Sequence, residues 1–545
     1  GTGNIIKLGD GNLRFYTPLH EWTGDLDIQD GFLGLQMNSG AIFNPTGKIY
    51  FGDSTGVQTS AIQMRIENRF YGNNTIGIDA PNMDLTVNRD IIVRDNIKQL
   101  VSIAAGYLPS SATIHFTNQI NVGNGSSSYV RFYYEDTSNL DASLTGHVQQ
   151  TVFDITGNIT GSNALYLDGN NAGALANGAT FTVWMRGDNS GYSGIMTIGN
   201  DTGGTANFGR NATLRIGDQA GLSEVTVFGT GGSIGFRNYG TLQLAGNSMT
   251  FTKNFLFTGG TGFSTSAGIE NASETAATIT FDSGTQTGPS FQDVGVGLRD
   301  GKAAGIFGTG NAALSVVKVG AGDTVFGAST GGGAVADSFS NYTGNTLVQE
   351  GTLYAGSNNS FSANSRFIVS SGATLSPYWA EAGSGFEVTI GSLAGEAGSA
   401  VNIDQSTLSI GNDNTFDADF AGVISGFGSL NKVGGGAQTL SGVNTFSGNL
   451  AVLQGTLIGS NNSAFGDAYN IINLGGVTFV GVHPLDAKVE LLLAGTASDV
   501  TNAVSMNTFD GNDEGIVVIG TRETSGTYGF GTGGTVSLYQ DISTN

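Results

Sequence analysis

The chain has 545 residues, a formal net charge of −23 and no cysteine. This charge argues against nucleic acids and anionic membranes as partners, because both are themselves negatively charged. The lack of cysteine excludes disulfides and thiolate metal sites. With 39% hydrophobic residues the chain is too apolar to be disordered, and 88 glycines with 7 prolines indicate many tight turns without collagen-like or proline-rich segments.

Short stretches with an apolar residue at every second position run along the chain. In residues 61–70, Ile62, Met64 and Ile66 share one face, and residues 83–87 repeat the pattern. Alternation with a period of two predicts strands, because successive side chains of a strand point to opposite faces. Glycine, Asn-Gly or Asp-Gly follows most of these stretches, and no window has helical periodicity. We therefore predict an all-β protein with Gly-rich turns and little or no α-helix.

Three segments align over twelve positions without a gap, namely WTGDLDIQDGFL (22–33), YTGNTLVQEGTL (342–353) and FSGNLAVLQGTL (446–457). Each contains two glycines seven residues apart, and these are Gly24 and Gly31, Gly344 and Gly351, and Gly448 and Gly455. We interpret the segment as turn, strand, turn and next strand, with glycine supplying a positive φ at both turns. A Lys-Leu/Val-Gly tripeptide precedes each copy, beginning at Lys7, Lys318 and Lys432.

The combined pattern resembles the passenger-associated repeat of bacterial autotransporters and related giant surface proteins. The resemblance is strongest in residues 426–457, followed by 1–33 and 308–353. It implies a right-handed parallel β-helix, in which rungs of a β-solenoid stack upon one another, and an extracellular or cell-surface protein. On this basis we expect a β-solenoid in three parts: 1–300 with divergent rungs after the first repeat, 301–415 with the second repeat, and 416–545 with the third repeat and an uncapped C-terminal strand.

The two ends of the sequence suggest how copies of the chain could associate. The chain begins on a predicted strand in mid-repeat and stops on another, and joining GTVSLYQDISTN to GTGNIIKLGDG gives roughly the lead-in of the internal repeats. We interpret the chain as a trimmed, mature form with its signal sequence removed, and we predict a head-to-tail homopolymer. The expected assembly interface consists of Ile5, Ile6, Leu8, Val536, Leu538, Tyr539 and Ile542.

Candidate catalytic, metal-binding or ligand-binding residues are few and scattered along the sequence. The four histidines lack metal-ligand spacing, and the acid-rich stretches 510–515 and 412–419 read as ordinary turns or as weak calcium sites. The RGD tripeptide at Arg186–Asp188 could suggest integrin recognition but is more often a plain turn, and Trp22 and Trp184 could stack on sugars or simply pack. We expect no catalytic residue, no cofactor and no metal.

The sequence is compatible with three functions. The first is an extracellular structural protein that stacks head to tail into a β-solenoid filament, sheath or surface appendage, with itself as its main partner. The alternative is a monomeric autotransporter-type adhesin passenger that binds host or glycan surfaces. A β-helix polysaccharide-degrading enzyme comes third, because it needs clustered carboxylates that the sequence does not reveal. None of the three includes a membrane-spanning segment, since the longest apolar runs have three or four residues.

Overall fold

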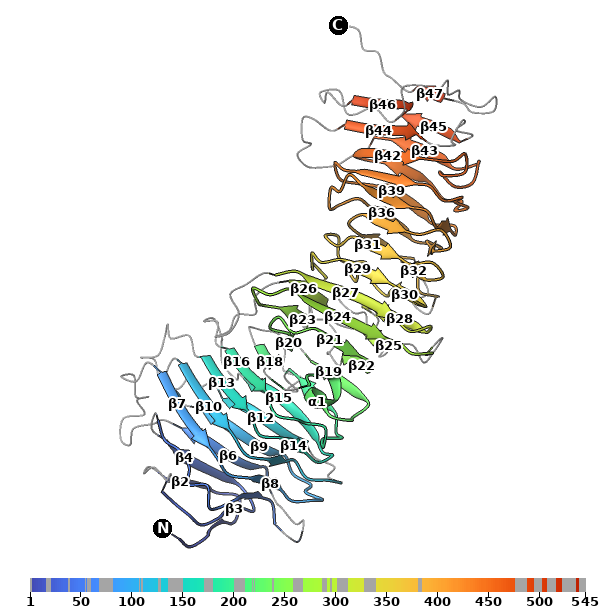
Figure 1. Cartoon of the computed structure of the whole chain (residues 1–545). Coiled ribbons are helices and arrows are strands. Elements are labelled where there is room, and N and C mark those ends of the chain that lie inside the picture. The colour runs from blue at the N-terminus through green and yellow to red at the C-terminus, as the bar shows by residue number, and fades with distance from the viewer. Residues whose placement is uncertain are drawn as a thin grey trace. The chain divides into compact units, whose positions relative to one another are not determined.

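The computed structural model describes the following residues: 2–15, 21–37, 40–53, 55, 60–67, 82–106, 108, 111–125, 129–135, 150–170, 180–199, 211–217, 219, 221–237, 240–257, 268–286, 292–294, 297–300, 312–327, 340–380, 385–475, 488–494, 502–506, 516–521 and 536–538. It divides into two compact units (Figure 1). Unit 1 comprises 1–277 and 300–312, and unit 2 comprises 278–299 and 313–545.

Unit 1 is a stack of parallel strands that form three sheets. The first has the order β1 (Ile5–Lys7), β3 (Leu26–Ile28), β5 (Ile49–Phe51), β8 (Ile91–Val93), β11 (Ile120–Asn121), β14 (Ile159–Thr160). The second contains β2 (Asn12–Phe15), β4 (Phe32–Gln36), β6 (Ile62–Glu67), β9 (Val101–Gly106), β12 (Tyr129–Glu135), β15 (Ala164–Asn170), β17 (Met196–Ile198), β19 (Ser233–Phe236), β22 (Asn254–Phe257). The third contains β7 (Asn82–Val87), β10 (Ser111–Phe116), β13 (Gln150–Ile155), β16 (Thr180–Met185), β18 (Asn211–Ile216), β20 (Thr241–Gln243), β23 (Gly268–Asn271).

Two further elements of unit 1 are β21 (Met249–Phe251) and the helix α1 (Glu224–Phe228). The helix has five residues, and Ser223 caps its N-terminus with a side-chain oxygen that accepts from the backbone N–H of Thr226. One boundary between the two units, after residue 299, falls within strand β26 (Gly297–Asp300). In the described residues helix is thus confined to one short turn, as the sequence predicted.

Unit 2 repeats the three-sheet plan. One sheet contains β24 (Ala277–Asp282), β27 (Leu314–Val319), β29 (Thr346–Val348), β31 (Phe367–Val369), β34 (Leu393–Gly395), β37 (Ala418–Phe420), β40 (Ala437–Leu440), β42 (Gly455–Gly459), β44 (Lys488–Leu493), β46 (Ile516–Thr521). The second contains β25 (Gln292–Val294), β28 (Asp323–Phe326), β30 (Thr352–Ala355), β32 (Thr374–Ser376), β35 (Ala400–Asn402), β38 (Val423–Ser425). The third contains β33 (Glu387–Thr389), β36 (Thr407–Ile410), β39 (Ser429–Lys432), β41 (Leu450–Val452), β43 (Ile471–Leu474), β45 (Ala503–Met506), β47 (Val536–Leu538).

The core of each unit consists of rows of apolar side chains that stack from rung to rung. One row of unit 1 is Leu85, Ile114, Phe153, Val183, Leu214, Leu242, Ile269. One row of unit 2 is Val388, Leu408, Leu430, Leu450, Ile472, Val504. Every member is at most 2% exposed, because the inward half of each alternating strand is sealed by the rungs above and below. The described strand pairings are all parallel, so the predicted parallel β-helix is confirmed.

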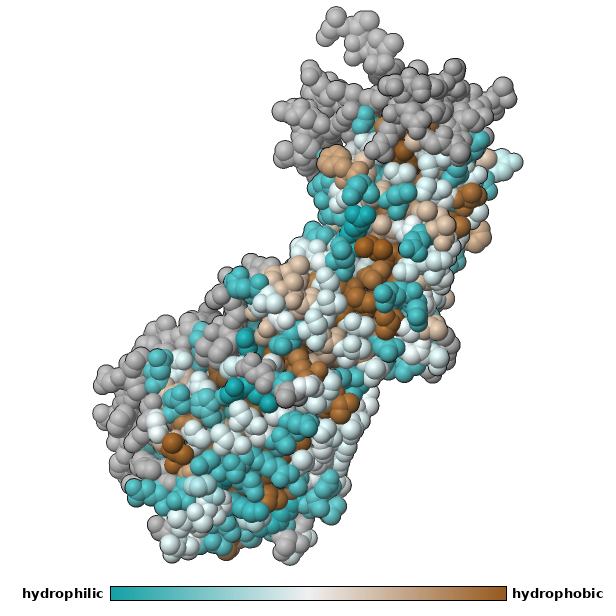
Figure 2. Space-filling view, viewed as in Figure 1, coloured by the Kyte–Doolittle hydropathy of each residue, from teal (hydrophilic) through white to brown (hydrophobic). Residues whose placement is uncertain are grey.

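Rung length differs between a central stretch of unit 2 and a stretch of unit 1. By their residue numbers, stacked core positions are 20 to 22 residues apart from Val388 to Ile472. From Leu85 to Val183 they are 29 to 39 residues apart. On the face shown in Figure 2, apolar residues are visible at the surface among hydrophilic ones.

Candidate functional site

The lysine of the third repeat lies inside the coil. Lys432 ends β39, its side chain is fully buried, and its Nζ donates hydrogen bonds to three backbone carbonyls. Two acceptors follow it directly, Val433 O at 2.6 Å and Gly434 O at 2.8 Å, and the third is Gln454 O at 3.1 Å, in the next rung. An ammonium group has three N–H donors, so these carbonyls satisfy all of them. We call this arrangement the lysine clamp.

The first and second repeats contain the same clamp. Lys7 and Lys318 are likewise buried, at 5% and 0% exposed. The acceptors are again the two carbonyls after the lysine and one carbonyl of the next rung: Val319 (2.9 Å), Gly320 (2.7 Å) and Glu350 (2.9 Å) for Lys318, and Leu8 (2.9 Å), Gly9 and Asp30 (3.0 Å) for Lys7. In every copy the acceptor of the next rung directly precedes the second repeat glycine, so each clamp ties two consecutive rungs together.

Burial changes the acidity of two of these lysines. Desolvation lowers the pKa of Lys432 to about 8, although the charge of Asp413 partly offsets it. Desolvation also lowers the pKa of Lys318 to about 8, against the opposing charges of Asp323, Asp282 and Glu350. At neutral pH both lysines are therefore predominantly protonated, and each buried cation is stabilised by oxygen dipoles rather than by water.

The second glycine of each repeat has the positive φ that the sequence suggested. Gly31, Gly351 and Gly455 have φ values of 71°, 63° and 73°. This left-handed region is costly for residues with a Cβ, and glycine adopts it freely. The turn brings each glycine against the carbonyls of the preceding rung, so a side chain would also collide with backbone there.

Glycine is required at the first position of each repeat for a different reason, and the prediction of a positive φ there was wrong. Gly24, Gly344 and Gly448 are not among the residues with positive φ. A Cβ on each would overlap a backbone carbonyl oxygen of the rung before, namely that of Gly3, Leu314 and Gly428, respectively. Glycine is required because two backbones approach too closely for any side chain.

The described residues of the expected assembly interface lie on β1 and β47, except Leu8, which directly follows β1. Ile5 is partly buried on β1, whereas Ile6 is 55% and Leu8 66% exposed. Val536 and Leu538 belong to β47, which pairs in parallel with β45. Tyr539 and Ile542 lie outside the described residues. The structure places the two sets on different units, and the predicted contact between copies stays a prediction.

A row of polar side chains crosses the outer face of the third sheet of unit 1. The strand register aligns His115, Asp154, Trp184, Arg215, Gln243, Glu270. Arg215 Nη1 donates to Gln243 Oε1 at 2.6 Å, and Gln243 Nε2 donates to Glu270 Oε1 at 3.3 Å. The Arg215 guanidinium also lies 5.4 Å from the centre of the Trp184 ring. We call this row the polar ladder, and its groups largely bind one another.

Asp154 is the centre of the polar ladder. Its side chain is 1% exposed, and its two oxygens accept from Arg186 Nε at 2.7 Å and Nη2 at 2.5 Å. His115 Nδ1 lies 2.6 Å from Asp154 Oδ2, and His115 Nε2 lies 3.2 Å from Asp84 Oδ1. The bidentate pair fixes the orientation of both the guanidinium and the carboxylate. Through Arg186 and His115, Asp154 connects its own rung to the next rung and to the preceding one.

The RGD tripeptide is part of this structure. Arg186 is bound to Asp154, and its guanidinium stacks on Trp184 at 4.5 Å from the ring centre. Asp188 Oδ1 accepts from the backbone N–H of Ser190 at 2.9 Å, which closes a turn. Because the arginine is engaged within its own sheet, the tripeptide functions as a structural turn, in line with the simpler interpretation of the sequence.

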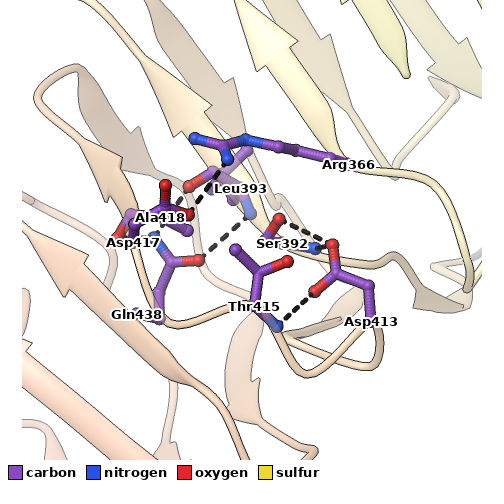
Figure 3. Close-up of polar contacts among 8 residues, drawn as sticks. All are labelled: Arg366, Ser392, Leu393, Asp413, Thr415, Asp417, Ala418 and Gln438. Carbon is purple, nitrogen blue, oxygen red and sulfur yellow. Dashed lines mark hydrogen bonds and ion pairs between the residues drawn. The ribbon is translucent and has the colours of Figure 1, made fainter. Parts of the chain in front are cut away.

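The acid-rich stretch 412–419 also serves the fold. In Figure 3, Asp413 Oδ2 accepts from Ser392 N at 2.8 Å and Oγ at 2.7 Å, and Asp413 Oδ1 accepts from Thr415 N at 3.1 Å. Arg366 Nη1 lies 3.2 Å from Asp417 Oδ1 in the same view. Asp413 thus bonds to the preceding rung and Asp417 to an arginine two rungs back, as expected of an ordinary acidic turn. The other stretch, 510–515, lies outside the described residues.

In the described residues, no three histidine, cysteine, aspartate or glutamate side chains are grouped so that they could hold a metal ion. No helix of the described part is long and apolar enough to cross a membrane.

The chain is a glycine-rich parallel β-helix, and its repeats resemble those of autotransporter passengers, as the sequence predicted.

Among curated proteins, it is similar to the adhesin BmaC autotransporter of Brucella suis biovar 1 (strain 1330), with 27% identity over 253 residues. The similarity covers 44% of this chain and 6% of the adhesin's length. No family model matches the chain, and no solved structure matches it.

Another buried cation, Arg89, is 1% exposed and could not be recognised from the sequence. Its Nε donates to Asn44 O at 2.6 Å and its Nη1 to Gly24 O at 2.8 Å, while Nη2 donates to Trp22 O. The guanidinium thus binds the backbone around the first repeat turn, much as the lysine clamp does. Only the rung-to-rung register reveals it, because the acceptors are 45 to 67 residues away.

Proposed function

We propose that the chain acts as an extracellular, non-enzymatic adhesin passenger that presents a long β-helical surface to a host or neighbouring cell. The observation that carries this proposal is the similarity to an autotransporter adhesin in a chain that forms a parallel β-helix. The same similarity favours a location at the cell surface. In this function the coil is a scaffold, and its outward side chains and loops make the contacts.

The state of the carboxylates supports a binding function over a catalytic one. A glycoside hydrolase or lyase needs acidic groups that face a substrate groove. In unit 1, Asp154 is paired with Arg186, Asp168 lies 3.3 Å from Arg131, and Glu270 accepts from Gln243. These buried acids serve rung-to-rung contacts, so they offer no general acid or base to a substrate.

Cell adhesion by the purified chain tests the proposal directly. Beads coated with the chain should bind cultured mammalian cells, and soluble chain should compete. Beads coated with heat-unfolded chain are the control for nonspecific attachment. Equal attachment of native and unfolded coatings would refute the adhesin function. Release of reducing ends from polysaccharides by the chain would instead favour the enzyme.

Head-to-tail assembly is a second proposal, and the exposure of Ile6 and Leu8 motivates it. Either a preceding rung or a second copy of the chain would cover these side chains. Electron microscopy at moderate salt should show filaments for the wild type and none for Ile6→Asp, while Ile42→Asp, at a site 57% exposed, should leave them intact. Single particles at every concentration would contradict assembly. With −23 per copy, filaments should increase with salt.

A further inference from the structure

Four large apolar side chains are exposed close together on unit 2. They are Val423 (39% exposed), Val443 (60%), Phe427 (77%) and Tyr469 (94%). We call this set the apolar band. Single exposed apolar residues are normal on soluble proteins, whereas a group of them indicates an interaction site.

Backbone hydrogen bonds place Val423 and Val443 on neighbouring rungs. The N–H of Thr445 donates to Ile424 O at 2.9 Å, as in the parallel pairing of the strands. In a parallel pair this bond places Thr445 beside Ser425. The same register, two residues earlier on both rungs, places Val443 beside Val423. Both valines point outward, since Ile424 and Asn444 between the exposed positions are buried.

Phe427 and Tyr469 lie further along their rungs than the valines, and the positive-φ Gly426 separates Phe427 from the end of β38. The N–H of Ser447 donates to Gly426 O at 2.9 Å, which puts Ser447 beside Phe427. The N–H of Asp467 donates to Phe446 O at 2.9 Å, so Asp467 follows Ser447 one rung further on. Tyr469 lies in the turn that begins there. Rungs are about 4.8 Å apart, so the backbones of Phe427 and Asp467 are roughly 10 Å apart, with Ser447 on the rung between them.

Carboxylates lie on both sides of Phe427. The N–H of Ile403 donates to Ser425 O at 2.9 Å, which places the partly exposed Asp404 beside Phe427 on the preceding rung. The exposed Asp467 lies two rungs on, and its Oδ1 accepts from Tyr469 N at 2.9 Å. From rung to rung the order is therefore Asp404, Phe427, Ser447 and then Asp467 with Tyr469.

The described residues 385–475 contain no exposed lysine or arginine. Lys432 is the only lysine or arginine of the sequence between Arg366 and Lys488, and it is buried in its clamp. The same stretch contains nine acidic residues, which are Glu381, Glu387, Glu396, Asp404, Asp413, Asp417, Asp419, Asp467, Asp486. Asp404 and Asp467 thus lie beside the apolar band without an exposed basic residue from this stretch, and a complementary partner has apolar and positive groups.

We propose that the apolar band docks a cationic, amphipathic segment of a partner protein. Apolar side chains of the segment cover Phe427, Tyr469 and the valines, and its lysines or arginines face Asp404 and Asp467. Aromatic residues at the centre of an interface carry much of its binding energy. A second copy of this chain would bring the same acidic surface and be repelled. The proposal rests on the proposed adhesin function, because it names the chemistry of the surface that is bound.

The probe is a synthetic amphipathic peptide of leucine and lysine, titrated by fluorescence anisotropy against the full chain at 0.15 M NaCl. The double variant Phe427→Ser/Tyr469→Ser should weaken binding at least tenfold. Phe416→Ser is the matched control, because Phe416 is 71% exposed in the same unit but lies in the turn before β37, and it should change affinity less than twofold. Asp404→Asn/Asp467→Asn should weaken binding and flatten its dependence on salt.

Several results would overturn the proposal. One is equal affinity of the peptide for the wild type and the double aromatic variant, with circular dichroism showing both folded. Another is a wild-type dimer in sedimentation that the aromatic substitutions convert to monomer, which would assign the band to self-association. Aromatic-dependent binding of neutral oligosaccharides without peptide binding would assign it to glycans.

Cell adhesion separates this proposal from the one on which it rests. If wild-type beads and beads with the double aromatic variant bind cells equally well, the docking surface is wrong and the adhesin function stands. If wild-type beads do not bind cells at all, the adhesin function fails whatever the peptide does.

Discussion

Replacing Lys432 by methionine removes the ammonium group while keeping an apolar side chain of similar length. Carbonyl oxygens of Val433, Gly434 and Gln454 then lose the donor that Nζ provides. Hydrogen bonds from a charged donor contribute about 2 kcal/mol each, or about 6 kcal/mol for three. The fall of the lysine pKa from 10.5 to about 8 corresponds to a burial cost of about 3 kcal/mol. We therefore expect Lys432→Met to lose about 3 kcal/mol of local stability.

Hydrogen exchange read by mass spectrometry measures this loss where it occurs. Peptides covering residues 432–457 should exchange faster in Lys432→Met by the factor that corresponds to about 3 kcal/mol, roughly a hundredfold. The control is Lys48→Met, because Lys48 is 48% exposed and lies 3.5 Å from Asp90, a surface pair worth less than about 1 kcal/mol. If the two variants changed exchange in their own rungs equally, the clamp would contribute no more than a surface ion pair and the reasoning would be refuted.

Three further predictions concern other contacts. Between pH 8 and 10.5 the unfolded lysine binds a proton and the folded one does not, so the wild type should gain up to about 3 kcal/mol of stability relative to Lys432→Met as pH rises. Urea unfolding of both proteins at several pH values measures this difference, and a difference that shrinks with pH would contradict the prediction. Gly448→Ala should cost more than about 2 kcal/mol by the same method, since its Cβ overlaps Gly428 O, whereas Gly232→Ala meets nothing within 4 Å and should stay within about 0.5 kcal/mol. Asp154→Ala should cost about 3 kcal/mol by removing the buried carboxylate that accepts from Arg186 Nε and Nη2. Asp417→Ala, at a carboxylate 80% exposed, should cost less than about 1 kcal/mol; equal losses would contradict the importance of burial.

The fold could be predicted because its signals are local in the sequence. Alternating apolar residues such as Ile62, Met64 and Ile66 mark a strand within six residues, and they are all buried in β6. The repeat spans little more than one rung, so its copies could be aligned by eye. The second glycines were interpreted correctly for the same reason, since a positive φ depends on the turn itself.

Contacts between rungs could not be predicted in the same way. Lysine is rarely buried, so nothing in the sequence around Lys432 indicated a clamp, and its third acceptor is 22 residues away. The first glycines were misinterpreted because their neighbour is the backbone of another rung. The polar ladder depends on a register between strands up to 39 residues apart, as between His115 and Asp154, and single-sequence reasoning does not supply that register.

The lysine clamp has a consequence for how such a chain can diversify. Lys432 and its acceptor Gln454 are 22 residues apart, but Lys318 and Glu350 are 32 residues apart, and both clamps have nearly the same geometry. Ten additional residues were therefore accommodated between two anchor points without disturbing either. Loop closure entropy grows only slowly with length, so each clamped rung can acquire new sequence at little thermodynamic cost. Evolution, or a protein engineer, can vary the segment between the anchors while the repeat around it stays unchanged.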